Sequence, residues 1–138
     1  MDGILEIVEA RESHWESIRI LRTHPKLQEG FIDQVSINEK QQKEYMKKYH
    51  KFYWVARLNE KTVGFVGVVE NDIRVAVDPE FHKRGIAKNM ILFIRKKYPD
   101  AIARVKIKNE NSLKLFQSVG FKINGFEKKK GELLYLMS

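Results

Sequence analysis

The fold of this chain is predicted most clearly by Ile73–Tyr98, which has the sequence IRVAVDPEFHKRGIAKNMILFIRKKY. Ile73, Val75 and Val77 alternate with other residues, a pattern typical of a half-buried strand. Pro79 ends this strand because proline has no amide hydrogen to donate to a neighbouring strand. Apolar residues then recur at helical spacing through the second half of the stretch. The stretch therefore predicts a strand, a glycine-containing loop and a helix.

The loop between this strand and this helix has the features of an anion site. The first amides of a helix have no partner within the helix and carry a partial positive charge, which suits a phosphate group. Lys83, Arg84 and Lys88 add full positive charges at the same place. Gly85 lets the backbone approach a ligand closely, since it has no side chain. We expect this loop to bind a phosphate-bearing molecule.

Length and composition predict one soluble globular domain over residues 1–138, with 43% hydrophobic residues. No apolar run approaches the length of a membrane span, and Met1–Gly3 does not begin a signal peptide, so a cytoplasmic location is expected. The absence of cysteine excludes disulfides and thiolate catalysis. No two histidines have the spacing of metal ligands, so no metal site is predicted.

The flanking sequence predicts further strands and helices around the central stretch. Strands are expected at 4–8, 52–58, 62–70, 73–77, 101–107, 121–126 and 132–137, and helices up to Arg22, at 39–49, after the loop and from Ser112 to Gly120. Ser13 and Asn38 are the expected N-caps of the first two helices. Residues 26–37 are too irregular to assign. The alternation of strands and helices indicates an α/β fold with a sheet of about six or seven strands.

Two motifs give the chain a family resemblance. His82-Lys83-Arg84-Gly85-Ile86-Ala87 resembles the acetyl-CoA loop of the Gcn5-related N-acetyltransferase (GNAT) superfamily, Gln/Arg-x-x-Gly-x-Gly/Ala, with His82 standing where glutamine or arginine is usual. The stretch from Asn109 to Phe121 resembles the second signature, Asn-x-x-Ala-x-x-x-Tyr-x-x-x-Gly-Phe. The resemblance implies a single GNAT-like domain, α/β or α+β, with a mixed, mostly antiparallel sheet and helices on both faces.

The resemblance also implies which residues bind acetyl-CoA, the acetyl donor. The backbone of Val75, Ala76 and Val77 would pair with the pantetheine arm, on a strand splayed from its neighbour. The pyrophosphate would lie on the amides of residues 83–88, with His82 as a further phosphate donor. Asn109 would reach the pantetheine arm, and Ser112 takes the alanine position of the second signature. The cofactor-binding residues expected from the loop are His82, Lys83, Arg84, Gly85, Ile86, Ala87 and Lys88.

Phe116 departs from the family pattern, since many members carry a tyrosine there whose phenol is thought to protonate the leaving thiolate of coenzyme A. Phenylalanine cannot donate a proton, so this role is vacant or filled by another group. Ser112, Ser118, Tyr135 and water are the alternatives. We expect Phe116 to pack beneath the cofactor.

Glu70 and Asp72 are the candidate general bases, because they lie at the turn that enters the central strand. A carboxylate there can accept the proton of the amine directly or through water. Alternatively, both residues merely cap a hairpin turn. His82 has a side chain that titrates near neutrality, but its place in the loop makes it a phosphate donor rather than a base.

Charge bears on the partner of the protein. The chain has 26 basic and 18 acidic residues, and residues 83–130 alone hold 14 of the former and 3 of the latter. Such asymmetry indicates an anionic ligand or partner. The phosphates of coenzyme A satisfy it, and so would a nucleic acid. A solvated basic surface is the remaining explanation.

The sequence thus favours an N-acetyltransferase that moves an acetyl group from acetyl-CoA to a primary amine. The basic balance disfavours polycationic acceptors and favours one that carries phosphate or carboxylate. A non-catalytic acetyl-CoA-binding regulatory module and, with less support, a nucleic-acid-binding protein are the alternatives. Exposed strand edges near the carboxyl terminus would allow a dimer, but nothing in the sequence decides the oligomeric state.

Overall fold

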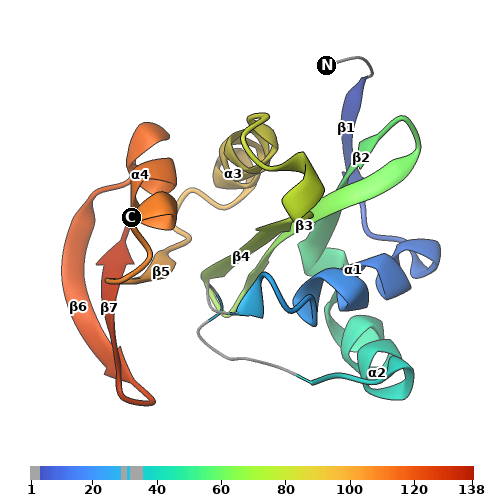
Figure 1. Ribbon diagram of the computed structural model, residues 1–138, viewed down its shortest axis with the longest axis horizontal. Helices are drawn as coiled ribbons and strands as arrows, with labels where there is room; N and C mark the ends of the chain where they lie inside the picture. The colour runs from blue at the N-terminus through green and yellow to red at the C-terminus, as the bar shows by residue number, and fades with distance from the viewer. Residues whose placement is uncertain (1–3, 29–30, 32–35) are drawn as a thin grey trace.

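The computed structural model describes residues 4–28, 31 and 36–138, and these form an α/β fold (Figure 1). The predictions on Met1–Gly3, and those on residues 29–30 and 32–35 of the irregular segment, lie outside this part. The elements in chain order are β1 (Leu5–Glu9), α1 (Trp15–Arg22), α2 (Glu39–Tyr49), β2 (Tyr53–Leu58), β3 (Lys61–Val69), β4 (Asp72–Val77), α3 (Ile86–Lys97), β5 (Ala103–Lys106), α4 (Glu110–Ser118), β6 (Ile123–Lys129) and β7 (Glu132–Met137).

The strands of the described residues form two sheets that stand side by side (Figure 1). The first has the order β1-β2-β3-β4 and the second the order β5-β7-β6, with antiparallel pairing within each. A single parallel bridge between Asp72 and Ile102 joins them. The predicted number of strands is confirmed, but the expected central sheet is divided between β4 and β5.

The division leaves most of the β4 edge open. The Ile73 amide donates to the Ile102 carbonyl over 2.9 Å, and the Ile102 amide donates to the Asn71 carbonyl over 2.9 Å. Beyond these two bonds, no backbone hydrogen bond joins β4 to β5 in the described residues. The two strands are therefore held at the start of β4 and diverge from there, as expected for a strand that is splayed from its neighbour.

Helices cover both faces of the first sheet. Ile18 and Leu21 of α1 and Met46 of α2 pack on one face, in a cluster with Tyr53 and Phe65. Three buried residues of α3 pack on the other face, namely Ile86, Met90 and Ile94. Helix α4 packs against the second sheet through Phe116 and Val119. No helix of the described residues is long and apolar enough to cross a membrane.

The local sequence predicted some helix ends better than others. Helix α2 has the predicted bounds, because the Asn38 side chain accepts a bond from the Gln41 amide and the Gln41 side chain accepts one from the Asn38 amide. The prediction of Ser13 as an N-cap was wrong, since Ser13 lies inside a 3-10 turn, Glu12–His14, and α1 begins after it.

The last hairpin also differs from its prediction. Strand β6 continues to Lys129, past the predicted end at Phe126, and the turn consists of Lys130 and Gly131 alone. Both residues have positive φ, 50° and 80°, which is the backbone of a two-residue hairpin turn. Strand β7, by contrast, has the predicted bounds.

Candidate active site

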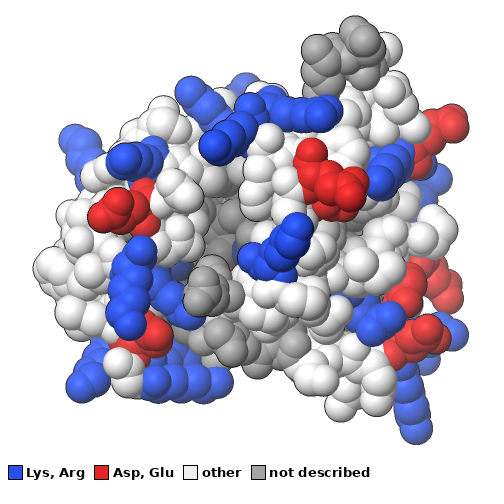
Figure 2. All heavy atoms as spheres, in the orientation of Figure 1, with Lys and Arg blue, Asp and Glu red and all other residues white. Residues whose placement is uncertain are grey.

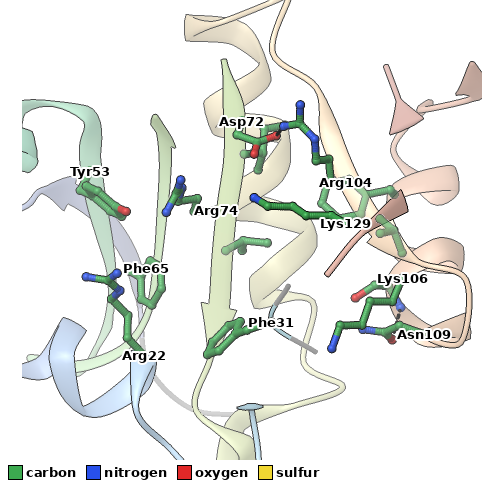
Figure 3. A pocket seen from close by; sticks show the side chains of 15 residues that line it. Arg22, Phe31, Tyr53, Phe65, Asp72, Arg74, Arg104, Lys106, Asn109 and Lys129 are labelled. Carbon is green, nitrogen blue, oxygen red and sulfur yellow. Dashed lines mark hydrogen bonds and ion pairs between the residues drawn. The ribbon is translucent and has the colours of Figure 1, made fainter. Parts of the chain in front are cut away.

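A cavity of about 180 Å³ lies where the two sheets diverge (Figure 3). Side chains from α1, from both sheets and from α4 line it, together with Phe31. Five of the predicted site residues are among them: Asp72, Val75, Asn109, Ser112 and Phe116. The structure thus brings the start of the central strand and the second signature to one place.

The open edge of β4 presents backbone groups to this cleft at alternate residues. The Ile73 amide faces β5, whereas the Asp78 amide faces β3 and donates to the Val63 carbonyl over 2.8 Å. Because amides alternate along a strand, those of Val75 and Val77 also face β5. The amide of Ala76 faces β3, where this residue pairs with Phe65. The prediction that the Ala76 backbone pairs with a ligand in the cleft is therefore not supported.

His82 lies at the carboxyl-terminal end of the open β4 edge. Its Nε2 lies 2.8 Å from the Val77 carbonyl oxygen, so the imidazole is directed at the end of β4. The carbonyl oxygen accepts, so Nε2 carries the hydrogen, and Nδ1 of the neutral ring is then an acceptor that cannot donate to a phosphate.

The loop after His82 gives helix α3 an open beginning. Gly85 is the N-cap of α3 with φ of 78°, and a Cβ at this position would meet no heavy atom within 4 Å. Lys83 has φ of 64° and is exposed, as are Arg84 and Lys88. The Arg84 guanidinium lies 5.1 Å from the Phe81 ring centre, which holds it beside the loop. The loop lies beyond the cavity, at the opposite end of β4 from Asp72.

The start of α4 forms the other wall of the cleft. The Asn109 side-chain oxygen accepts a bond from the Ser112 amide over 3.1 Å and so caps the helix, one turn before the predicted start. Its oxygen is thereby occupied, and its NH₂ group is the part of the side chain that suits a ligand carbonyl.

Phe116 is 5% exposed and packs edge-on against Phe121, with ring centres 5.2 Å apart. It also borders the cavity. Of the alternative proton donors, Ser112 also borders the cavity. Ser118 instead donates to the Leu115 carbonyl over 2.6 Å, and Tyr135 packs against the Phe126 ring.

The two candidate bases occupy different positions. Glu70 is exposed in the turn between β3 and β4, with φ of 53°, and does not line the cavity. Asp72 lines the cavity, but its carboxylate is ion-paired with the Arg104 guanidinium. Arg104 also bonds Glu127 over 3.2 Å.

This Asp72–Arg104–Glu127 group connects β4, β5 and β6 at the point where the two sheets meet. Burial alone lowers the pKa of Arg104, but the hydrogen bonds that it donates to Glu127 and Asp72 and the charges of both carboxylates raise it overall. Arg104 is therefore held in its charged form as the link between the two sheets.

Ten of the residues that line the cavity were not predicted from the sequence as site residues, and three of these are Arg22, Tyr53 and Arg74. Figure 3 places them together on one side of β4, with Arg104, Lys106 and Asn109 on the other side. The Tyr53 and Tyr45 hydroxyls are 2.8 Å apart, and burial raises the pKa of the Tyr53 phenol far above its usual value, so the phenol stays protonated. The alternation of β4 indicates that Arg74 faces away from Val75, but the strand register needed to place Tyr53 beside it is not evident from the sequence.

Basic side chains border the cleft on the surface as well. Figure 2 shows Lys and Arg on both sides of the hollow between the two sheets, and a gathering at the lower left over the β6–β7 hairpin. This hairpin carries Lys128, Lys129 and Lys130. The surface charge therefore has the sign that the sequence predicts for the half containing the glycine loop.

An open strand edge thus leads from the glycine-capped start of α3 into a cavity between diverging strands. Residues 49–123, more than half of the chain, match the acetyltransferase (GNAT) domain. The chain therefore belongs to the GNAT family of acetyltransferases, and the predicted resemblance is confirmed. Enzymes of this family use acetyl-CoA as the acetyl donor.

Relatives agree with this assignment. The peptidyl-lysine N-acetyltransferase YiaC of Escherichia coli (strain K12) is 31% identical over 72 residues, which are 51% of this chain and 49% of that protein. The chain thus matches about half the length of this relative.

Solved structures share the fold. A spermidine N-acetyltransferase from Vibrio cholerae, in complex with CoA and spermine, superposes with a TM-score of 0.83 at 14% identity, over 96% of this chain and 93% of that one. An acetyltransferase from Salmonella typhimurium with its cofactor acetyl-CoA gives a TM-score of 0.80 at 14% identity, over 96% and 91%. At such identities these neighbours establish the fold.

Proposed function

We propose that this domain transfers the acetyl group of acetyl-CoA to a primary amine. The observation that carries the proposal is the unpaired edge of β4, which connects the start of α3 to the cavity at Asp72. Pyrophosphate would bind at the α3 amides and Lys83, Arg84 and Lys88. The pantetheine arm would run along β4, between Val75 and Val77 on one side and Asn109 on the other.

The reaction needs few protein groups. The amine nitrogen attacks the thioester carbonyl carbon, the C–N bond forms and the C–S bond breaks, and coenzyme A leaves as a thiolate. The Val75 amide faces the cleft and can donate to the carbonyl oxygen as it becomes negative. Holding amine and thioester together can supply on the order of 7–11 kcal/mol of the barrier reduction.

Proton transfer depends on which groups near the cavity are free to exchange a proton. An ion-paired carboxylate is a poor proton acceptor, because protonation breaks the pair. We therefore assign Asp72 to linking the sheets, and propose that solvent takes the proton of the amine. The thiolate would be protonated by water or by the Ser112 hydroxyl, since Phe116 has no proton to give.

The test is turnover of acetyl-CoA with a panel of primary amines, followed by free thiol release and by the mass of the acetylated product. Val75→Pro removes the amide that faces the cleft without removing a bond to β3. We expect its kcat to fall by about 10²–10³ with acetyl-CoA still bound, since this is the usual cost of losing one oxyanion donor. Binding of acetyl-CoA without turnover of any amine would instead identify a non-catalytic module.

The acceptor is constrained by charge. Among the described residues that line the cavity, Asp72 carries the one carboxylate, and the basic side chains are Arg22, Arg74, Arg104, Lys106 and Lys129. Spermine, named with the Vibrio cholerae enzyme, is a polycation that would be repelled here. A peptidyl lysine, as named for the Escherichia coli relative, presents one amine and is compatible only where its surroundings carry negative charge. We therefore favour an acceptor with an anionic group.

A further inference from the structure

A row of three residues crosses the first sheet on the face covered by α1 and α2. The strand register pairs Tyr53 of β2 with Gly67 of β3, and Gly67 with Arg74 of β4. A Cβ on Gly67 would lie 2.7 Å from Tyr53 Cδ1 and 2.9 Å from Cε1, so the tyrosine ring occupies the space above the glycine. The glycine thus lets the ring of Tyr53 lie over β3 in the direction of Arg74, as Figure 3 shows.

The hydroxyl of this tyrosine is held in place by a second tyrosine. Tyr53 is 1% exposed, and its hydroxyl lies 2.8 Å from that of Tyr45. Either hydroxyl can donate in this bond, and the O–H hydrogen that the pair does not use is on the accepting hydroxyl. Tyr53 therefore presents its hydrogen to a ligand when Tyr45 donates. Burial raises the pKa of the Tyr53 phenol, so the phenol stays neutral and carries no charge that would repel an anion.

Arg22 is held at the same place by α2. Its Nη1 donates to Gln42 Oε1 over 3.2 Å, and its guanidinium lies 4.4 Å from the Tyr45 ring centre. Gln42 is 2% exposed and donates to the Trp15 carbonyl over 2.9 Å, so it is itself fixed between α1 and α2. One N–H of the guanidinium is used in this way, and the remaining donors are positioned before any ligand binds.

Arg22 and Arg74 differ from Arg19 and Arg104 in their ion pairs within the described part of the chain. Arg104 is paired with two, and Arg19 is paired with Glu16 at 2.6 Å. Among the residues that the structure describes, no acidic side chain is ion-paired with Arg22 or Arg74. Two guanidinium groups that have no ion pair within the described residues border the cavity together with a neutral phenol, and this combination favours an anion.

We propose that Arg22, Arg74 and the Tyr53 hydroxyl bind the anionic group, a carboxylate or a phosphate, of the amine that is acetylated. The proposal rests on the acetyltransferase function proposed above. The phosphates of coenzyme A would lie elsewhere, at the start of α3, which is at the opposite end of β4. Phe31 and Phe65 border the same part of the cavity and suit the apolar chain between the anionic group and the amine.

The experiment measures binding and turnover of four matched amines by the full chain loaded with CoA or acetyl-CoA. These are γ-aminobutyrate, aminopropylphosphonate, γ-aminobutyramide and diaminobutane, which differ mainly in one terminal group. We expect the carboxylate, the phosphonate or both to bind about 10- to 100-fold more tightly than the amide, as for hydrogen bonds to charged groups. The carboxylate and phosphonate arms distinguish the two kinds of anion.

Arg74→Gln should abolish this preference by raising KM for the anionic amine while leaving kcat and acetyl-CoA affinity unchanged. Arg74→Glu should reverse the preference in favour of the diamine. Lys96→Gln, which removes an exposed charge on α3, is the matched control and should preserve it. Arg22→Gln provides a second variant on another element.

Equal binding of the amide and the anionic amines, or a preference that survives Arg74→Gln, would overturn the proposal. If the proposal fails in this way but γ-aminobutyramide is acetylated, the acetyltransferase function is still supported. If an anionic amine binds with the predicted dependence on Arg74 but no amine is acetylated, the anion site stands and the acetyltransferase function fails.

Discussion

Replacing Gly67 by alanine tests the row of residues that builds the acceptor side of the cavity. The added Cβ would lie 2.7 Å from Tyr53 Cδ1 and 2.8 Å from the Phe52 carbonyl oxygen. Neither neighbour can move freely, because one is a ring that is 1% exposed and the other is backbone. Overpacking of this kind costs about 1–3 kcal/mol, which for a chain of this size lowers Tm by about 3–12 °C.

Chemical denaturation followed by tryptophan fluorescence measures this loss directly. Gly125→Ala is the control, since a Cβ there would lie 3.7 Å from Leu136 Cδ1, an ordinary contact. We expect the control to change the free energy of unfolding by less than about 0.5 kcal/mol. Gly67→Ala should also raise KM for the acceptor, because it displaces the Tyr53 ring, while acetyl-CoA affinity stays unchanged.

A Gly67→Ala protein that is as stable as the parent and has the same KM for the acceptor would contradict the packing of the Tyr53 ring above Gly67. Such a result would mean that the tyrosine ring does not occupy the space above β3. If stability falls but KM for the acceptor does not change, the Tyr53 ring does pack above Gly67, but Tyr53 does not contribute to acceptor binding.

Three further changes probe the rest of the structure. Arg104→Met should destabilise the protein by about 1–3 kcal/mol in denaturation, because Asp72 loses its partner, and the added change Asp72→Asn should recover part of the loss. Phe116→Ala should cost about 3–5 kcal/mol by leaving a cavity, and a smaller cost would show that the site collapses easily. Burial lowers the pKa of His14, and the charges of Arg57 and Arg11 lower it further. Neutral His14 therefore makes its full contribution to the free energy of unfolding above its ordinary pKa of 6.5, and this contribution is lost as pH falls through and below that value. His14→Gln should therefore flatten unfolding free energy against pH in this range, and an unchanged slope would contradict the assignment.

The sequence predicted best those elements that its own local chemistry determines. Asn38 and Gln41 define the start of α2 by bonding each other's backbone, so this boundary needed no tertiary information. The β6–β7 turn was placed too early, because charged residues after Phe126 read as a loop although they continue an exposed strand. Ser13 failed as a cap because the chain forms a 3-10 turn before α1.

The acetyl-CoA part of the site could likewise be predicted from local sequence, whereas the acceptor part could not. The acetyl-CoA loop is a contiguous motif, so Gly85 and its neighbours could be proposed from the sequence alone. Arg22, Tyr53 and Arg74 come together only through strand register and helix packing, which no short pattern specifies. The candidate base Asp72 could not be evaluated without its partner Arg104, which lies on another strand.

The measurement that tests the central claim most directly is calorimetric titration of acetyl-CoA into the parent protein, Gly85→Glu and Gly131→Glu. Gly85 and Gly131 have φ of 78° and 80°, and a Cβ would meet nothing within 4 Å at either position, so both variants bear the same backbone strain and the same added charge. We predict binding by the parent and by Gly131→Glu, and loss of binding by Gly85→Glu alone, since only that carboxylate would meet the pyrophosphate. Equal binding by all three proteins would contradict the assignment of the acetyl-CoA site.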